Sequence, residues 1–391
     1  MHLTAEEERI YNGEQGWAYQ TAMKILVKIG DLFDAERLIP IQSAHIAGVS
    51  YKTLGDAPIE FLEALAKTGA KSKTASTANP SGLDYEGIIG SAVSRDIREK
   101  QAKIVELYQR MGIKPVLTCT PYYISKPEND SHMAWAESSA VIYANSVLGS
   151  WTNREGGPSA LASALIGKTP DYGLHKPENR KPNIRVRVEP ELRNEAEFGA
   201  LGITLGKNLL DKVPFIEGLC SPRETDLKQL GAALASSGMT SIFYPCSRCP
   251  KSAEKLETVT VDRMGLKNAF EGLSTSSENP DMVFIGCPHC SLSEVKRVAE
   301  LLEGKKVKRN VRFWVCASRH VKAKATNHAR TIEVAGGKVV SDLCAVVTWL
   351  RELGVDTLMT NSAKTAYYAP TLNKVNVRFA TLEQCIETAT I

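Results

Sequence analysis

Short apolar segments alternate with amphipathic helical segments along most of the chain, and this alternation constrains the fold more than any other feature. In the first half, strands are predicted near residues 38–43, 70–77 and 114–119, with helices over 58–69 and 94–112 between them. From residue 183 the pattern resumes, and strands are predicted near 183–188, 213–218, 240–245, 281–286, 311–316, 337–342 and 355–360. Strands separated by helices are typical of βαβ units, whose strands run parallel. The sequence therefore predicts an α/β fold with parallel sheets.

Helix starts and lengths follow from local patterns. Thr4 and Glu7 have capping-box spacing, and Ser291 and Glu294 repeat it just before an apolar periodicity close to 3.6 residues. Another helix is predicted over residues 17–37. Residues 132–150 and 159–167 are rich in small residues and are predicted as two helices flanking a loop at 151–159.

The Pro-rich and basic segment 169–183 is predicted to connect two lobes. We therefore expect an N-terminal α/β lobe with a helical insertion over residues 1–182, and a C-terminal α/β lobe over 183–391.

Charge and composition limit the classes of function that the chain can have. The net charge of +4 over 391 residues is small and is not concentrated in a basic run, which disfavours nucleic acid as a partner. The first residues are acidic and carry no apolar signal segment, and no apolar run reaches the about 20 residues of a membrane span. We expect a cytoplasmic protein whose nine cysteines are free thiols rather than disulfides.

Side chains suited to chemistry recur where the predicted strands end. They are His45, Asn79 and Cys119 in the first half, and Cys287, Cys316, Cys344, Asn361, Ser362 and Lys364 in the second. Ligands of open parallel sheets bind beyond the carboxyl ends of the strands. A capped helix beginning near Ser291 also favours a thiolate at Cys287. We therefore expect these side chains to form one ligand-binding site at the carboxyl ends of the strands.

The cysteines allow three interpretations. Cys246 and Cys249 form one C-x2-C pair and Cys287 and Cys290 another, and four thiolates can hold a structural zinc ion. The gap between the pairs exceeds the usual about 15–20 residues, and a thioredoxin-like redox role lacks the expected fold context. The third interpretation takes one cysteine from each of several strand ends to hold an iron–sulfur cluster with an open iron. Spacing alone does not choose among them.

A free cysteine is most often a small buried apolar residue, and this is the simplest interpretation of Cys220, Cys385 and Cys316.

Five segments carry a family resemblance. They are TCTPYYISKP (118–127), the long block 134–175, IGCPHCSLSEV (285–295), DLCAVV (342–347) and MTNSAKTAYYAP (359–370). In matching order, they resemble the aconitase X family over nearly the whole chain. The resemblance implies an aconitase-like fold of several parallel-sheet α/β subdomains, with a cluster site between them at the carboxyl ends of strands.

The resemblance also implies a cofactor and a reaction. Its ligands would be Cys119, Cys287 and Cys344, holding an iron–sulfur cluster that we expect to be [4Fe-4S] with one open iron. Cys246, Cys249, Cys290 and Cys316 fall outside the shared pattern. The reaction would be a dehydration of 5-phosphomevalonate, a small phosphorylated hydroxy acid, with cis-3-hydroxy-L-proline as the alternative substrate. A zinc-stabilised scaffold without catalysis is the alternative from another class.

The resemblance further implies a partner. Fused members of the family continue into a small swivelling domain, whereas this chain ends at Ile391. We therefore expect that domain on a separate small subunit, which would supply a serine base, so that this chain alone would be inactive.

Candidate site residues come from the most distinctive blocks. Arg154 would clamp the substrate carboxylate and Glu137 would orient a proton path. The predicted catalytic set is Glu137, Asn153, Arg154, Glu155 and Lys364, and the predicted substrate-binding set is His45, Thr77, Asn79, Asn361 and Ser362. His289 is a candidate to support the cluster through a hydrogen bond.

Overall fold

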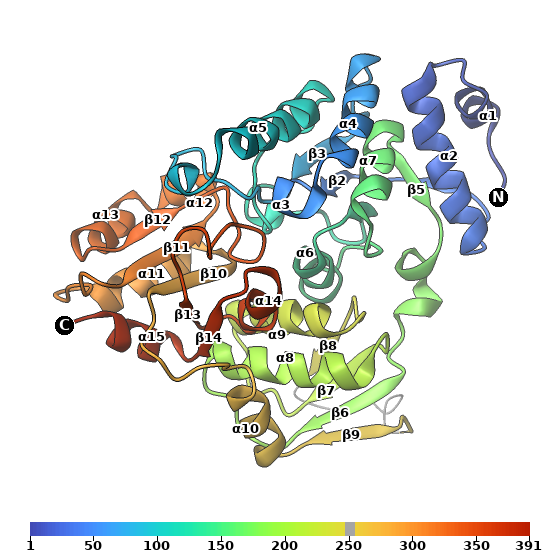
Figure 1. Cartoon of the computed structure of the whole chain (residues 1–391). Helices are drawn as coiled ribbons and strands as arrows, with labels where there is room; N and C mark the ends of the chain where they lie inside the picture. The colour runs from blue at the N-terminus through green and yellow to red at the C-terminus, as the bar shows by residue number, and fades with distance from the viewer. Residues whose placement is uncertain (247–254) are drawn as a thin grey trace.

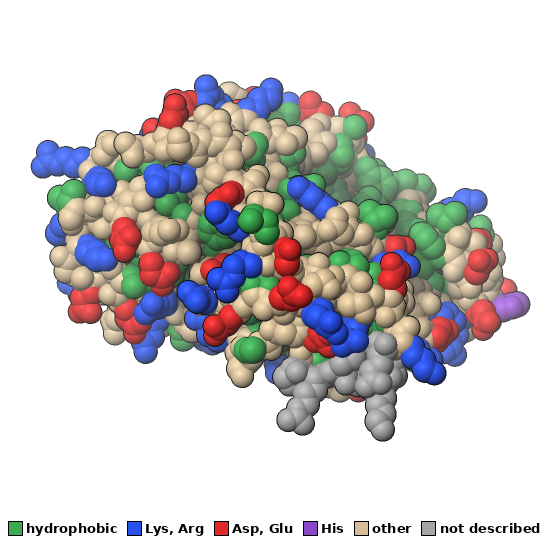
Figure 2. Space-filling model, turned by 90° about the horizontal axis from the view of Figure 1, so that it is seen from below, with side chains coloured by type: hydrophobic (Ala, Val, Ile, Leu, Met, Phe, Trp, Pro, Cys, Tyr) green, Lys and Arg blue, Asp and Glu red, His purple; other side chains and the backbone are tan. Residues whose placement is uncertain are grey.

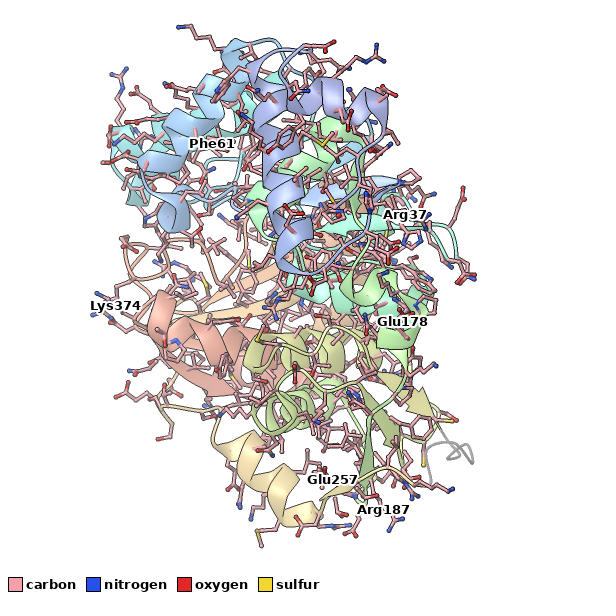
Figure 3. All side chains as sticks on the ribbon, turned by 90° about the vertical axis from the view of Figure 1, so that its right-hand side faces the viewer. Arg37, Phe61, Glu178, Arg187, Glu257 and Lys374 are labelled. Atoms are coloured by element: carbon pink, nitrogen blue, oxygen red, sulfur yellow. The ribbon has the colours of Figure 1, made fainter. Side chains whose placement is uncertain are left out.

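The protein is an α/β structure with four sheets, described by a computed structural model for residues 1–246 and 255–391. Three of the sheets are parallel, and the fourth is a two-stranded antiparallel pair. Figure 1 shows the N-terminal part at the top, the part around residues 184–271 at the bottom and the C-terminal part at the left. In the side view, Phe61 lies in the upper part of the molecule, and Glu257 and Arg187 lie near the bottom (Figure 3).

The N-terminal part is built on a parallel sheet with the order β3-β2-β4, beside the antiparallel pair β1-β5. Its elements are α1 (Ala5–Tyr11), α2 (Trp17–Leu32), β1 (Leu38–Pro40), β2 (Ser43–Ile46), α3 (Tyr51–Leu54), α4 (Ala57–Lys67), β3 (Ala75–Ala78), α5 (Arg95–Arg110), β4 (Met133–Trp135), α6 (Ser138–Tyr143), α7 (Gly157–Ile166) and β5 (Lys168–Pro170). The capping box of Thr4 and Glu7 is confirmed. The apolar core of the N-terminal part lies between the parallel sheet and helices α2, α4, α5 and α7.

The middle part is a four-stranded parallel sheet with the order β8-β7-β6-β9. Its elements are β6 (Ile184–Val188), α8 (Glu195–Leu209), β7 (Pro214–Glu217), α9 (Glu224–Ser237), β8 (Tyr244–Cys246), β9 (Thr258–Val261) and α10 (Arg263–Glu271). Helices α8 and α9 pack tightly because Gly202 and Gly206 allow their backbones to approach. A Cβ at Gly202 would lie 2.5 Å from the carbonyl oxygen of Leu230.

The C-terminal part is a five-stranded parallel sheet with the order β12-β11-β10-β13-β14. Its elements are β10 (Met282–Cys290), α11 (Leu292–Leu302), β11 (Arg312–Ala317), α12 (Arg319–Lys324), α13 (Thr326–Val334), β12 (Lys338–Val340), β13 (Thr357–Thr360), α14 (Ala363–Leu372), β14 (Asn376–Phe379) and α15 (Leu382–Ala389). β10 is buried along its whole length and lies at the centre of the sheet. The predicted capping box of Ser291 and Glu294 begins α11.

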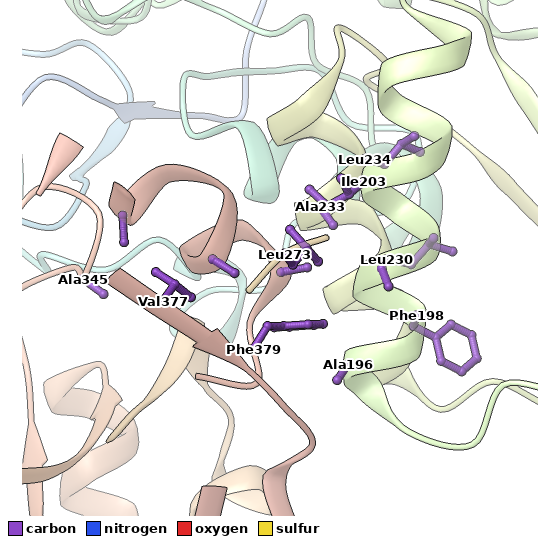
Figure 4. Close-up of a cluster of buried hydrophobic side chains, with 14 of the residues drawn as sticks. Ala196, Phe198, Ile203, Leu230, Ala233, Leu234, Leu273, Ala345, Val377 and Phe379 are labelled. Atoms are coloured by element: carbon purple, nitrogen blue, oxygen red, sulfur yellow. The ribbon is translucent and has the colours of Figure 1, made fainter. Parts of the chain in front are cut away.

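One apolar core joins the middle and C-terminal sheets. Figure 4 shows Phe198 and Ile203 of α8, Leu230 and Leu234 of α9, and Phe379 of β14 in this cluster. Because the helices of one sheet bury apolar side chains against the next sheet, the region predicted as one C-terminal lobe contains two sheets over a shared core. The boundary predicted near residue 182 stays a prediction.

Several predicted elements differ in the structure. The strand predicted at 240–245 begins only at Tyr244, and β9 and β14 were not predicted. The helix predicted over 17–37 ends at Leu32. In place of a helix from residue 132, Met133–Trp135 form the buried strand β4 and the helix begins only at Ser138, because a short buried apolar run has the same pattern in either state. The strand predicted at 114–119 is a loop that makes one bridge at Lys114, since Leu117 has a φ of 45° that is incompatible with a strand.

Charged side chains of both signs are interspersed on the face shown in Figure 2. Among the described residues, none of the helices combines the length and apolar character needed to cross a bilayer.

Candidate active site at the meeting of three cysteine-bearing segments

Three cysteines from separate segments lie together at the centre of the site, Cys119 and Cys287 buried and Cys344 partly exposed. Cys287 is in β10, Cys119 lies in the loop after α5, and Cys344 lies in the loop after β12. The Cys344 thiol donates a hydrogen bond to the Cys287 sulfur, and the main-chain N–H of His289, two residues after Cys287, donates to the Cys119 sulfur at 3.2 Å. The structure thus brings together the three predicted ligands, which lie far apart in sequence.

The surroundings set the ionisation of these thiols. The hydrogen bond from Cys344 lowers the pKa of Cys287 to about 6 in spite of burial, and the charge of Lys364 acts in the same direction. Burial and the negative charge of Glu137 raise the pKa of Cys119 to about 12. The pKa of Cys344 is also raised, because this thiol donates to Cys287 and is desolvated. In this arrangement Cys287 is the thiol most readily ionised.

A buried hydrogen-bonded chain runs beside the cysteines. His45 Nδ1 lies 2.8 Å from Thr77 Oγ1, and His45 Nε2 lies 3.3 Å from Asn79 Oδ1. Asn79 Nδ2 donates to Glu137 Oε2 at 2.7 Å, and Lys364 Nζ donates to Glu137 Oε1 at 2.5 Å. Five predicted site residues therefore form one connected chain. They come from β2, from β3 and the residue after it, and from the N-terminal ends of α6 and α14.

Charge and burial decide the protonation states in this chain. Burial would raise the pKa of Glu137, but the charge and hydrogen bond of Lys364 and the bonds from Asn79 and Ser139 lower it to about 2. Burial lowers the pKa of Lys364, but the charge of Glu137 outweighs it and raises that pKa overall. Burial lowers the pKa of His45 to about 4. At neutral pH the chain holds a carboxylate, an ammonium and a neutral imidazole.

Asn361 and Ser362 lie at the N-terminal end of α14. Ser362 is the N-cap and accepts from the N–H of Thr365. Asn361 is 7% exposed, and its Oδ1 finds no hydrogen-bond partner among the described residues. It lines a cavity of about 260 Å³ together with Arg223 at the N-terminal end of α9 and with residues of α11, among them Arg297. Of the two predicted substrate-binding residues, Ser362 thus lies next to Cys287, and Asn361 lines an adjoining cavity.

The structure does not bring Asn153, Arg154 and Glu155 into this chain. Arg154 donates to the carbonyl oxygens of Ala235 and Gly238 at the end of α9, at 2.8 and 3.1 Å. Asn153 bonds the main chain of Tyr172 and Leu174, and Glu155 accepts from Ser159 and Thr169. Their polar atoms hold the loop 151–156 against α7, α9 and the segment after β5.

The other cysteines have different surroundings. Cys290 lies in an apolar cluster with Val295 and Val298, on the α11 side of the sheet. The Cys316 thiol donates to the carbonyl oxygen of Leu343 at 3.3 Å. Cys246 ends β8, and Cys249 lies outside the described residues, so the zinc interpretation that needs it stays untested. The cysteines within the described ranges form no disulfides.

Within residues 1–246 and 255–391, no three His, Cys, Asp or Glu side chains converge as ligands of a single metal ion would. The thiolates of an iron–sulfur cluster bind different iron atoms and need not converge on one point.

Two residues beyond the predicted site also belong to it. Thr118 and the fully buried Lys228 both bond His289, Thr118 through its side chain and Lys228 through the carbonyl oxygen of His289. No sequence pattern marks Lys228, because it lies in the middle of α9 and reaches the site only through packing.

The fold and site define an α/β protein with a cysteine-lined centre at the ends of parallel strands, and comparison with known proteins agrees. Family models described as Aconitase X first, second and third domain match residues 1–178, 182–271 and 280–391. The chain belongs to the aconitase X family.

Individual relatives cover the whole chain. The phosphomevalonate dehydratase large subunit of Methanocaldococcus jannaschii is 43% identical over 99% of this chain and 100% of its own length. The cis-3-hydroxy-L-proline dehydratase of Pseudomonas aeruginosa is 34% identical over 99% of this chain and 70% of its own length. The crystal structure of Thermococcus kodakaraensis aconitase X in its holo-form superposes with a TM-score of 0.92, at 43% identity and full coverage of both chains.

Proposed function

We propose that the chain is the catalytic large subunit of a hydro-lyase that dehydrates (R)-5-phosphomevalonate to trans-anhydromevalonate 5-phosphate. The observation that carries this proposal is full-length similarity. Relatives named phosphomevalonate dehydratase large subunit align with 95–100% of this chain and 94–100% of their own length. The cis-3-hydroxy-L-proline dehydratases are 34% and 30% identical, and this chain spans 70% and 68% of them. The hydroxyproline is therefore the second candidate substrate.

The relatives' description as large subunits supports a small-subunit partner. We assign to this partner the swivelling domain and the serine that removes the α-proton. The enzyme would work in the cytoplasm, apart from membranes and nucleic acid.

Cys119, Cys287 and Cys344 would hold an iron–sulfur cluster, for which we favour [4Fe-4S] with one open iron. The donor set supports this assignment, since thiolates are the usual ligands of such clusters and the partly exposed Cys344 lies beside the buried Cys119 and Cys287. The lowered pKa of Cys287 favours the thiolate form that ligation needs. When bound, the cluster would act as a Lewis acid toward the substrate hydroxyl and carboxylate.

The residues of this chain would prepare the site for charge and proton movement. Lys364 keeps Glu137 ionised and places a positive charge beside the cysteines, where the substrate carboxylate and the departing hydroxide need compensation. Glu137 fixes the amide of Asn79, which in turn orients the neutral imidazole of His45. The oxygen atoms of the substrate would meet Ser362 and Asn361 at the N-terminal end of α14.

The test is an anaerobic assay of this chain purified together with its small subunit, offered each substrate separately. We expect water elimination from 5-phosphomevalonate and little or no turnover of cis-3-hydroxy-L-proline. Turnover of the hydroxyproline alone would replace the proposed substrate by the second candidate. A colourless protein that contains stoichiometric zinc and dehydrates neither compound would favour the zinc-stabilised scaffold.

A further inference from the structure

His289 is bonded through every one of its polar atoms. Its main-chain N–H donates to the Cys119 sulfur at 3.2 Å, and its carbonyl oxygen accepts from Lys228 Nζ at 3.1 Å. Its Nδ1 lies 2.9 Å from Thr118 Oγ1, and its Nε2 lies 2.8 Å from the carbonyl oxygen of Leu343. The side chain is 1% exposed, so water does not compete for these bonds.

The partners of the ring determine where its proton lies. A carbonyl oxygen only accepts, so Nε2 carries the proton and donates it to Leu343. In the neutral ring, Nδ1 then accepts from the hydroxyl of Thr118. That hydroxyl oxygen in turn accepts from the main-chain N–H of Thr120 at 3.2 Å. The bonds are mutually consistent, with one donor and one acceptor at each step.

These contacts connect the three segments that carry the cysteines. His289 lies two residues after Cys287, Thr118 precedes Cys119, and Leu343 precedes Cys344. The three segments come from distant parts of the chain. The side chain of His289 joins the Cys287 segment to the Cys119 segment through Thr118 and to the Cys344 segment through Leu343. The Leu343 carbonyl also accepts from the thiol of Cys316. The loop that carries Cys344 is therefore bonded both to His289 of β10 and to Cys316 of β11.

We propose that His289 is a positioning residue that holds Cys119, Cys287 and Cys344 in their mutual arrangement before any cofactor binds. The identity of the cofactor rests on the proposed function, whereas the placement of the thiols does not. Partners that orient metal ligands typically contribute about 10–100-fold to metal affinity. The same reasoning gives Thr118 a share of the role, because its hydroxyl is the link to the Cys119 loop.

The experiment compares His289→Ala, Thr118→Val and Thr118→Ser in the full chain. Thr118→Val removes the hydroxyl at nearly constant volume, and Thr118→Ser restores it. His175→Ala is the matched control, since His175 is also a buried histidine but bonds His132 away from the cysteines. Two quantities are measured: the rate at which reconstituted protein loses iron to a chelator, and the alkylation of Cys119 in the metal-free chain by mass spectrometry.

We expect His289→Ala and Thr118→Val to lose iron about 10-fold faster than the wild type, and their Cys119, 4% exposed in the wild type, to be alkylated severalfold faster. Thr118→Ser and His175→Ala should match the wild type in both measurements. Wild-type behaviour of His289→Ala and Thr118→Val would overturn the proposal. If His289→Ala does not fold, the Thr118 pair decides. If the wild type takes up no iron, the cofactor assignment fails, and the alkylation rates alone decide whether His289 positions the thiols.

Discussion

The ammonium group of Lys364 lies 2.5 Å from the carboxylate of Glu137, although 227 positions separate the two residues in the sequence. Their side chains are only 10% and 12% exposed. The pair joins the N-terminal ends of α14 and α6, and so fixes the C-terminal sheet against the N-terminal part beside the cysteines. Because a buried charge is stable only when compensated, each residue depends on the other.

Lys364→Met should therefore destabilise the chain strongly. It leaves the Glu137 carboxylate buried without its counter-charge, and we expect the free energy of unfolding to fall by about 3–5 kcal/mol. Chemical denaturation of the metal-free chain measures this. The double variant Lys364→Met with Glu137→Gln should recover part of the loss, whereas removal of the exposed ion pair between Arg95 and Glu99 should change little. Additive effects of the two site substitutions would contradict the coupling.

Single alanine substitutions of Cys119, Cys287 and Cys344 should each abolish cofactor retention and water elimination. Each removes a thiolate ligand, so we expect iron per chain to fall at least about 10-fold after anaerobic reconstitution. Iron analysis and the visible absorption spectrum check this. The exposed Cys220 is the control, and its substitution by serine should leave both measurements unchanged. Retention of iron and activity in all three variants would refute the ligand assignment.

Stability should decrease as the pH falls from about 6.5 toward 4. Burial lowers the pKa of His45 to about 4 and that of His175 to about 3, from an ordinary value near 6.5. In this range the unfolded chain binds protons that the folded chain excludes, so acid favours unfolding. Glu137, with its pKa lowered to about 2, adds a further loss of stability below about pH 4.5.

Urea unfolding of the metal-free chain at several pH values tests this dependence. His45→Gln and His175→Gln should each flatten the curve between pH 6.5 and 4. A free energy of unfolding that stays constant or rises toward pH 4 would show that these imidazoles are protonated in the folded state.

Arg154→Ala should lower stability without impairing substrate binding. The guanidinium donates to carbonyl oxygens at the end of α9, where a cation contributes about 0.3–1 kcal/mol. Thermal unfolding and steady-state kinetics of the heterodimer separate the two roles. Arg154→Lys, which keeps the cation, should recover part of the stability. A large rise in KM at unchanged stability would instead support the predicted clamp on the substrate carboxylate.

Local patterns predicted much of the fold. The capping boxes at Thr4 and Ser291 and the strands β6, β7, β8, β10, β11, β12 and β13 follow from side-chain periodicity and hydrogen bonding over a few residues, whereas β9 and β14 were not predicted. Elements with ambiguous patterns were predicted wrongly. Met133–Trp135 form a strand because they pair with β2, and residues 114–119 form a loop because Leu117 adopts a positive φ. Pairing partners and loop dihedrals depend on distant residues.

The order of residues along the chain by itself determined most of the segments that become strands and helices, and it marked the cysteines and polar residues that follow them. Only the tertiary structure decided which of these side chains meet. It joined His45, Asn79, Glu137 and Lys364 in one hydrogen-bonded chain and placed Arg154 at the C-terminal end of α9. It also placed Lys228 and His289 beside the segments that carry the cysteines. The physical reason is that periodicity and capping act over a few residues, whereas buried charges and hydrogen bonds select partners only after the sheets have packed together.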